Sequence, residues 1–91
     1  LGPFNIRANA ICPGGVEGPR LDGVIEREAV AKGVRTEEIR EAYAAGTSML
    51  SLVSPTDVAN TAVFLASDAA RLISGQAIAV DGHTEHPEPK L

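Results

Sequence analysis

Aromatic side chains and cysteine are scarce in this chain of 91 residues. Aromatic residues make up 3% of the sequence, and tryptophan is absent. A core must therefore be built from Ala, Val, Ile and Leu, which suits closely packed layers of helix on sheet. The single cysteine, Cys12, lies in a predicted strand, where we expect a small, buried, apolar residue. One cysteine also fits a reducing cytoplasm.

The chain also lacks an excess of positive charge and any long hydrophobic run. Its 8 Lys and Arg residues against 12 Asp and Glu residues give a net charge of −4. Nucleic acids and anionic membranes require concentrated positive charge, so neither is predicted as a partner. No apolar run approaches the roughly 20 residues that span a bilayer. We therefore predict a cytoplasmic protein of at most one domain.

The most informative stretch is residues 5–20, which read NIRANAICPGGVEGPR. Residues 6–12 alternate in a way that predicts a strand. The strand must stop at Pro13, which donates no ladder hydrogen bond, and Gly14 and Gly15 follow it with a permissive backbone. Open α/β sheets bind ligands where a strand ends in a glycine-rich loop, so residues 13–18 are the predicted ligand contact.

Two charged helices are predicted next, at residues 21–32 and 36–45. Gly33 and Gly46 stand where each would end, and Thr36 is a candidate N-cap. More than half of the charged residues lie between Arg20 and Glu41, and the apolar stripes are thin. We therefore expect a helical pair on the surface rather than a core element, acting as a movable cover.

The clearest helix start is Ser54-Pro55-Thr56-Asp57, in which Ser54 and Asp57 can form a capping box and Pro55 fits the first turn. The predicted helix, 54–67, is apolar over most of its circumference, which indicates burial on two sides. A strand at 76–81 has an apolar run without alternation, typical of a parallel strand buried on both faces. Together these segments predict a β-α-β arrangement.

Three strings now identify a resemblance: NIRANAICPGGVEGPR, SPTDVANTAVFLASDAA and ISGQAIAVDGH. In order and spacing they resemble the C-terminal third of the short-chain dehydrogenase/reductase family. The resemblance implies an α/β fold, the C-terminal part of a Rossmann-type doubly wound parallel sheet. It would contain two strands, a helical substrate-loop pair at 20–47 and one buried helix. It covers residues 1–84, with 85–91 left as an irregular tail.

The family resemblance also implies an activity and a cofactor. Its members transfer a hydride between NAD or NADP and a small-molecule alcohol or carbonyl substrate. The cofactor-binding residues carried over to this chain are Pro13, Gly14, Gly15, Val16 and Gly18. In the family the backbone at the position of Val16 binds the nicotinamide carboxamide. A threonine commonly stands where this chain has Gly18, so the hydroxyl contact of that threonine is not available here.

Weaker substrate contacts are implied at Arg20, Leu21 and Tyr43, all in the substrate-loop segment. For Arg20 an alternative reading is a solvated charge, or an ion pair with Glu17 or Asp22. No metal site is predicted, because the metal-ligand residue types gather in a proline-flanked tail with no preset geometry: Asp81, His83, Glu85 and His86.

No residue of the chain is assigned as catalytic. The family uses a Ser and a Tyr-x-x-x-Lys helix, whereas Tyr43 is followed by Ala-Ala-Gly-Thr, and no glycine-rich strand–turn–helix is found. We expect a fragment of such an enzyme, inactive alone. The alternative is a non-catalytic fragment that forms homo-oligomers through residues 54–67 and 76–81, because an apolar helix beside a bare edge strand calls for a partner.

Overall fold

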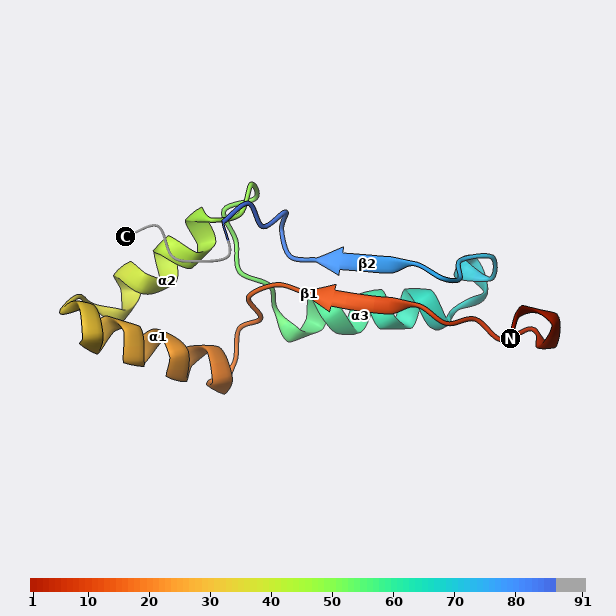
Figure 1. Ribbon diagram of the computed structural model, residues 1–91, viewed down its shortest axis with the longest axis horizontal. Coiled ribbons are helices and arrows are strands. Elements are labelled where there is room, and N and C mark those ends of the chain that lie inside the picture. The colour runs from red at the N-terminus through yellow and green to blue at the C-terminus, as the bar shows by residue number, and fades with distance from the viewer. Residues whose placement is uncertain (87–91) are drawn as a thin grey trace.

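The computed structural model describes residues 1–86 and has two lobes within an envelope of 56 × 23 × 18 Å (Figure 1). One lobe contains two strands and a helix, and the other contains two helices that lie beyond the carboxyl ends of the strands (Figure 1). In chain order the elements are η1 (Gly2–Phe4), β1 (Ala10–Pro13), α1 (Pro19–Lys32), α2 (Thr36–Ala45), α3 (Pro55–Ala66), η2 (Asp68–Ala70) and β2 (Ala77–Val80).

The two strands form a parallel sheet, which confirms the predicted α/β class. Ala10 lies opposite Ala77 and Pro13 opposite Val80, and α3 runs along one face of the sheet (Figure 1). Both strands are shorter than the predicted 6–12 and 76–81. Before Ala10, hydrogen bonds from side chains take the place of the backbone hydrogen bonds between strands. The Arg7 and Asn9 side chains both donate to the carbonyl of Ile73, at 3.3 and 3.0 Å.

The sheet lobe is less buried than the sequence predicts. Ala77, Ala79 and Cys12 are exposed, so the predictions of a strand buried on both faces and of a buried cysteine are wrong for this chain. Within residues 1–86 only Leu65 of α3 is buried and Val63 is 70% exposed, so the second partner surface that the sequence predicts for this helix is not supplied by the described residues. The physical reason is that, within residues 1–86, α3 covers one face of the sheet and the sheet covers one side of α3.

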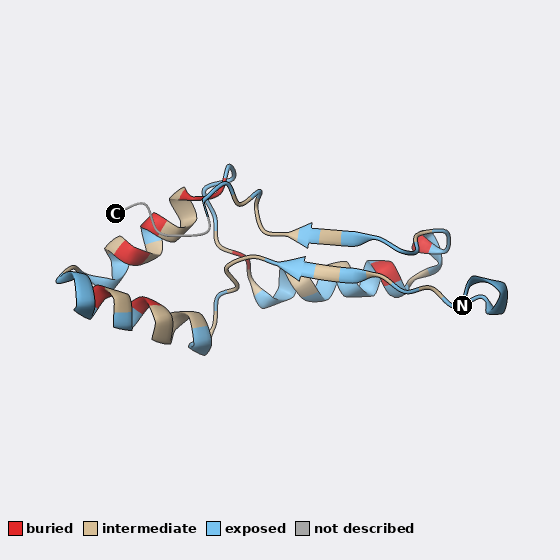
Figure 2. Ribbon diagram, in the orientation of Figure 1, coloured by how far each residue is buried: buried red, intermediate tan, exposed pale blue. Residues whose placement is uncertain are grey.

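The helical pair, in contrast, contains the tightest packing (Figure 2). Ile25 and Ile39 are 1% and 0% exposed, and they form one buried cluster with Ala29. The prediction that the pair is not a core element is therefore wrong, because each helix supplies the apolar surface that the other one buries. The predicted range 36–45 is confirmed, whereas α1 begins two residues early at Pro19. The N-cap of α2 is Arg35 rather than Thr36.

Irregular segments join the two lobes. Val16 forms an isolated parallel bridge with Val53, and Thr47 forms an antiparallel bridge with Thr84. Of the irregular tail predicted at 85–91, Glu85 and His86 donate their N–H groups to the carbonyl of Gly46, and 87–91 lie outside the described residues. Within residues 1–86, no helix has the length and apolar character needed to cross a membrane.

Candidate functional site

The glycine loop begins at the paired carboxyl ends of β1 and β2. The Gly14 N–H donates to the carbonyl of Val80 at 3.0 Å, which continues the strand ladder by one residue. A Cβ on Gly14 would stand 2.6 Å from the Cβ of Asp81 and 3.0 Å from its Cα. The close approach of the two strand ends therefore requires glycine at this position.

Beyond Gly14 the loop pairs on one side with the connector that precedes α3. The Val53 N–H donates to the carbonyl of Gly15 at 2.9 Å, and the Glu17 N–H donates to the carbonyl of Val53 at 2.7 Å. These two bonds flank Val16. Because successive peptide groups of an extended chain point to opposite sides, the N–H and C=O of Val16 face away from the connector. Among residues 1–86 neither group has a hydrogen-bond partner.

All the predicted cofactor residues lie together. A hollow of about 440 Å³ is lined by the loop and the first turns of α1, including Pro13, Gly14, Gly15, Val16 and Gly18. Arg20 and Leu21 line the same hollow, as the predicted substrate contacts would require. Sequence reasoning missed Val24, although its spacing of three residues after Leu21 places both on one helix face.

Tyr43 does not line this hollow. Its hydroxyl donates to Oε1 of Glu28 at 2.6 Å, which ties α2 to α1. Its ring packs against the core of the helical pair and borders a small cavity of about 90 Å³ with Gly15 and Leu21. Glu28 also forms an i,i+4 ion pair with Lys32, with 3.8 Å between Oε2 and Nζ. Tyr43 is thus placed as a packing residue of the pair.

Arg40 forms ion pairs with two carboxylates, one of which, that of Glu17, lines the hollow. Its Nη2 lies 2.5 Å from Oδ1 of Asp22, and its Nη1 lies 3.6 Å from Oε1 of Glu17. The alternative that Arg20 pairs with Glu17 or Asp22 is wrong within the described residues, because Arg40 holds both carboxylates. No local signal marks Arg40, since 18 residues separate it from Asp22.

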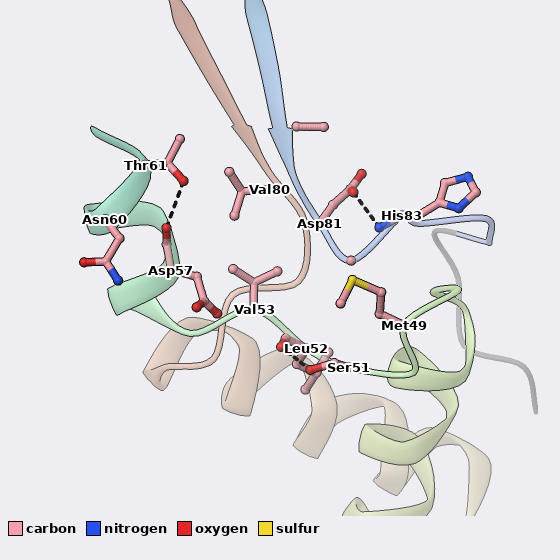
Figure 3. Close-up of a pocket in the computed structure, with 12 residues that line it drawn as sticks. Met49, Ser51, Leu52, Val53, Asp57, Asn60, Thr61, Val80, Asp81 and His83 are labelled. Atoms are coloured by element: carbon pink, nitrogen blue, oxygen red, sulfur yellow. Dashed lines mark hydrogen bonds between the residues drawn. The ribbon is translucent and has the colours of Figure 1, made fainter. Parts of the chain in front are cut away.

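A second hollow, of about 520 Å³, lies on the other side of the connector, between the end of β2 and the start of α3 (Figure 3). Sequence reasoning did not find it. Two of its polar side chains bond to nearby backbone: Thr61 donates to the carbonyl of Asp57 at 3.0 Å, and Oδ1 of Asp81 accepts from the His83 N–H at 2.8 Å (Figure 3). Within residues 1–86 no three side chains of metal-ligand type come together.

Comparison with known proteins gives the family. The family model described as enoyl-(acyl carrier protein) reductase matches residues 1–83. The crystal structure of a short chain dehydrogenase family protein from Francisella tularensis superposes with a TM-score of 0.85 at 27% identity, covering 90% of this chain and 34% of that one. The chain belongs to the short-chain dehydrogenase/reductase family. The resemblance and the Rossmann-type fold class predicted from the sequence are thereby confirmed.

Two further relatives of this short-chain dehydrogenase/reductase chain are named for their activities. The chain is 39% identical over 82 residues to the 7α-hydroxysteroid dehydrogenase of Escherichia coli. The matched region covers 90% of this chain and 28% of that enzyme. The NAD-bound 3-oxoacyl-[acyl-carrier protein] reductase of Brucella melitensis superposes with a TM-score of 0.66 at 28% identity, covering 93% of this chain and 26% of that one. The chain thus spans 26% to 34% of the length of these three relatives.

Proposed function

We propose that this chain supplies the nicotinamide wall of an NAD(P) site in an oxidoreductase that acts on a small alcohol or carbonyl substrate. The observation that carries the proposal is the orientation of Val16, whose N–H and C=O are turned away from the Val53 bridge. A carboxamide has one acceptor oxygen and an NH₂ donor, so it complements this pair of backbone groups. Gly14 and Gly15 precede Val16 and leave its backbone accessible.

In this proposal the chain's own residues bind and orient. The backbone of Val16 fixes the rotation of the carboxamide. The apolar side chains of Leu21 and Val24 line the hollow and exclude water from it. The nicotinamide, when bound, supplies the hydride-transfer chemistry. No residue of the chain is assigned the proton transfer, because Tyr43, the one tyrosine, is bonded to Glu28 on the neighbouring helix.

The test compares the two halves of the cofactor on the 91-residue chain. We expect titration with reduced nicotinamide mononucleotide at millimolar concentration to shift the NMR amide signals of residues 14–18, and AMP, as the control, to leave them in place. Shifts located elsewhere, or none at all, would show that the loop is not a nicotinamide wall.

We also propose that the chain alone binds little cofactor and is inactive, and a calorimetric titration with NADH and NADPH, followed by an activity assay, tests this. We expect little binding and no turnover, because a glycine-rich turn for the pyrophosphate and a Tyr-x-x-x-Lys helix are not found in the 91 residues. Clear micromolar affinity in this titration would contradict it.

A homo-oligomer is the second candidate, and the exposed apolar surface of α3 favours it. Val63 and Phe64 are 70% and 48% exposed, and β2 pairs only with β1 among the described strands, which leaves its other edge open.

We expect light scattering to detect a dimer that Phe64→Asp dissociates, while Val30→Asp, at an exposed position of α1, leaves the dimer intact. A monomer that melts cooperatively counts against this candidate.

A further inference from the structure

The helical pair has little to hold it against the cofactor loop. Among the elements of residues 1–86, α1 and α2 pack on each other and make no contact with β1, β2 or α3 (Figure 1). The path from the loop into α1 passes through Gly18, whose φ of 155° and ψ of 179° belong to a region that is open essentially to glycine alone. The orientation of the pair therefore depends on contacts across this glycine and, at the other end of the pair, on the hydrogen bonds between residues 46–49 and 82–86.

Arg40 makes such a contact from the far helix. Four ion pairs are formed within residues 1–86, and two of them, Glu28–Lys32 and Arg35–Glu38, join residues three or four apart on one helix. The other two both belong to Arg40, which reaches from α2 to Glu17 and Asp22. Glu17 precedes Gly18 and Asp22 follows it, so one guanidinium holds both sides of the turn.

We propose that Arg40 is a positioning residue that fixes the helical pair against the cofactor loop. This inference rests on the proposed function, because Glu17 directly follows Val16, the residue whose backbone would bind the carboxamide. The two Nη atoms of Arg40 each meet a different carboxylate, a division that the planar fork of arginine allows and a single lysine ammonium reproduces poorly. Without Arg40 the carboxylates of Glu17 and Asp22 would lose the cation that they share.

The experiment measures amide hydrogen exchange in the 91-residue chain, without cofactor. The reporting amides are those of Glu17, bonded to the Val53 carbonyl, and Asp22, bonded to the Gly18 carbonyl. In Arg40→Gln we expect both to exchange about 3- to 10-fold faster, the range that two partly exposed ion pairs support. The matched control is Arg35→Gln, which removes the same charge and a local ion pair from the start of the same helix. We expect the control to stay within about twofold of the wild type.

A mutant cycle separates the ion pairs from the packing of the arginine stem. In the Glu17→Gln/Asp22→Asn background, Arg40→Gln should produce no further acceleration, and Arg40→Lys in the natural background should restore only part of the protection. In 1 M salt the difference between wild type and Arg40→Gln should shrink, because partly exposed charges are screened. An unchanged exchange rate in Arg40→Gln, or an equal acceleration in both backgrounds, would overturn the inference.

The link to the cofactor loop has its own readout. With reduced nicotinamide mononucleotide, we expect the apparent affinity reported by the Gly15 and Val16 amides to fall about threefold or more in Arg40→Gln. Equal affinity in the two proteins would overturn the positioning role, while the proposed function would stand. If the wild type shows no shifts, the proposed function fails instead, and the exchange measurements alone decide whether Arg40 fixes the loop.

Discussion

Single residues around the glycine loop are constrained for different physical reasons. At Gly14 the constraint is space, since the ends of β1 and β2 leave no room for a Cβ beside Asp81. At Gly18 the constraint is conformation, because nothing lies within 4 Å of a Cβ there, yet its φ of 155° strains any other residue. The glycine at the position where the family commonly has threonine is thus explained by the path of the backbone into α1.

Gly14→Ala tests the spatial constraint. The new methyl group must push Asp81 away, which separates the ends of the two strands, so we expect a loss of about 1 to 3 kcal/mol in the free energy of unfolding, measured by urea denaturation. Gly2→Ala is the control, because nothing lies within 4 Å of a Cβ at that position. Equal stability of the two variants would contradict the tight approach at Gly14.

At the scale of elements, α3 shows how a helix start is specified by a few neighbouring residues. The Asp57 N–H donates to Oγ of Ser54 at 3.1 Å, and the Ser54 N–H donates to Oδ2 of Asp57 at 2.9 Å. This is the predicted capping box, and Pro55 occupies the first turn as predicted. The box satisfies two backbone donors that the helix itself leaves unpaired.

Ser54→Ala should therefore destabilise the chain by about 1 kcal/mol, the usual cost of losing an N-cap side chain. Thr56→Ala is the matched control, because Thr56 is an exposed first-turn residue that makes no side-chain hydrogen bond within the described part of the chain. Urea denaturation followed by circular dichroism measures both. A Ser54→Ala protein as stable as the Thr56→Ala protein would show that the cap contributes nothing.

The same cap predicts a pH dependence. The hydrogen bond from the Ser54 backbone, followed by that with its side chain, lowers the pKa of Asp57 below the ordinary value of 3.8. A depressed carboxyl pKa stabilises the folded state above the unfolded pKa, and this contribution is lost as pH falls through the folded value. We expect the NMR titration of the Asp57 side chain to give a midpoint below 3.8 in the wild type. In Ser54→Ala the midpoint should rise only in part, because the backbone N–H of residue 54 still donates to Asp57; no change would contradict the contribution of the Ser54 side chain.

On the scale of the whole molecule, the two lobes are held together by irregular segments rather than by packing. The core of Ile25, Ala29 and Ile39 lies entirely within the helical pair (Figure 2). The sheet lobe depends instead on β1, β2 and one side of α3. The stability of each lobe should therefore respond mainly to its own side chains.

Ile39→Ala tests this independence. Ile39 is 0% exposed, and its truncation should cost about 2 to 5 kcal/mol within the helical pair. Hydrogen exchange should then accelerate in residues 19–45 and remain nearly unchanged in 55–80. Ile6→Ala, at a side chain that is 48% exposed, serves as the control. Equal acceleration throughout the chain would show that the lobes unfold as one unit.

Interactions between neighbouring residues were specified by the sequence alone. The capping box of α3, the range of α2, the ion pair of Glu28 and Lys32 and the glycines that follow α1 and α2 all depend on residues within one or two turns. The grouping of residues 13–18 with Arg20 and Leu21 followed from their closeness along the chain. Composition and periodicity were sufficient here, because backbone hydrogen bonds and helix geometry are local.

Tertiary structure decided burial and long-range charge pairing. The apolar runs of α3 and β2 predicted burial, yet burial requires a partner surface, and Val63 finds none within residues 1–86. The thin stripes of α1 and α2 became the core because the two helices face each other. The choice of Arg40 over Arg20 as the partner of Asp22 depends on how α2 folds back onto α1, which no local pattern encodes. Those outcomes are set by which surfaces meet in space.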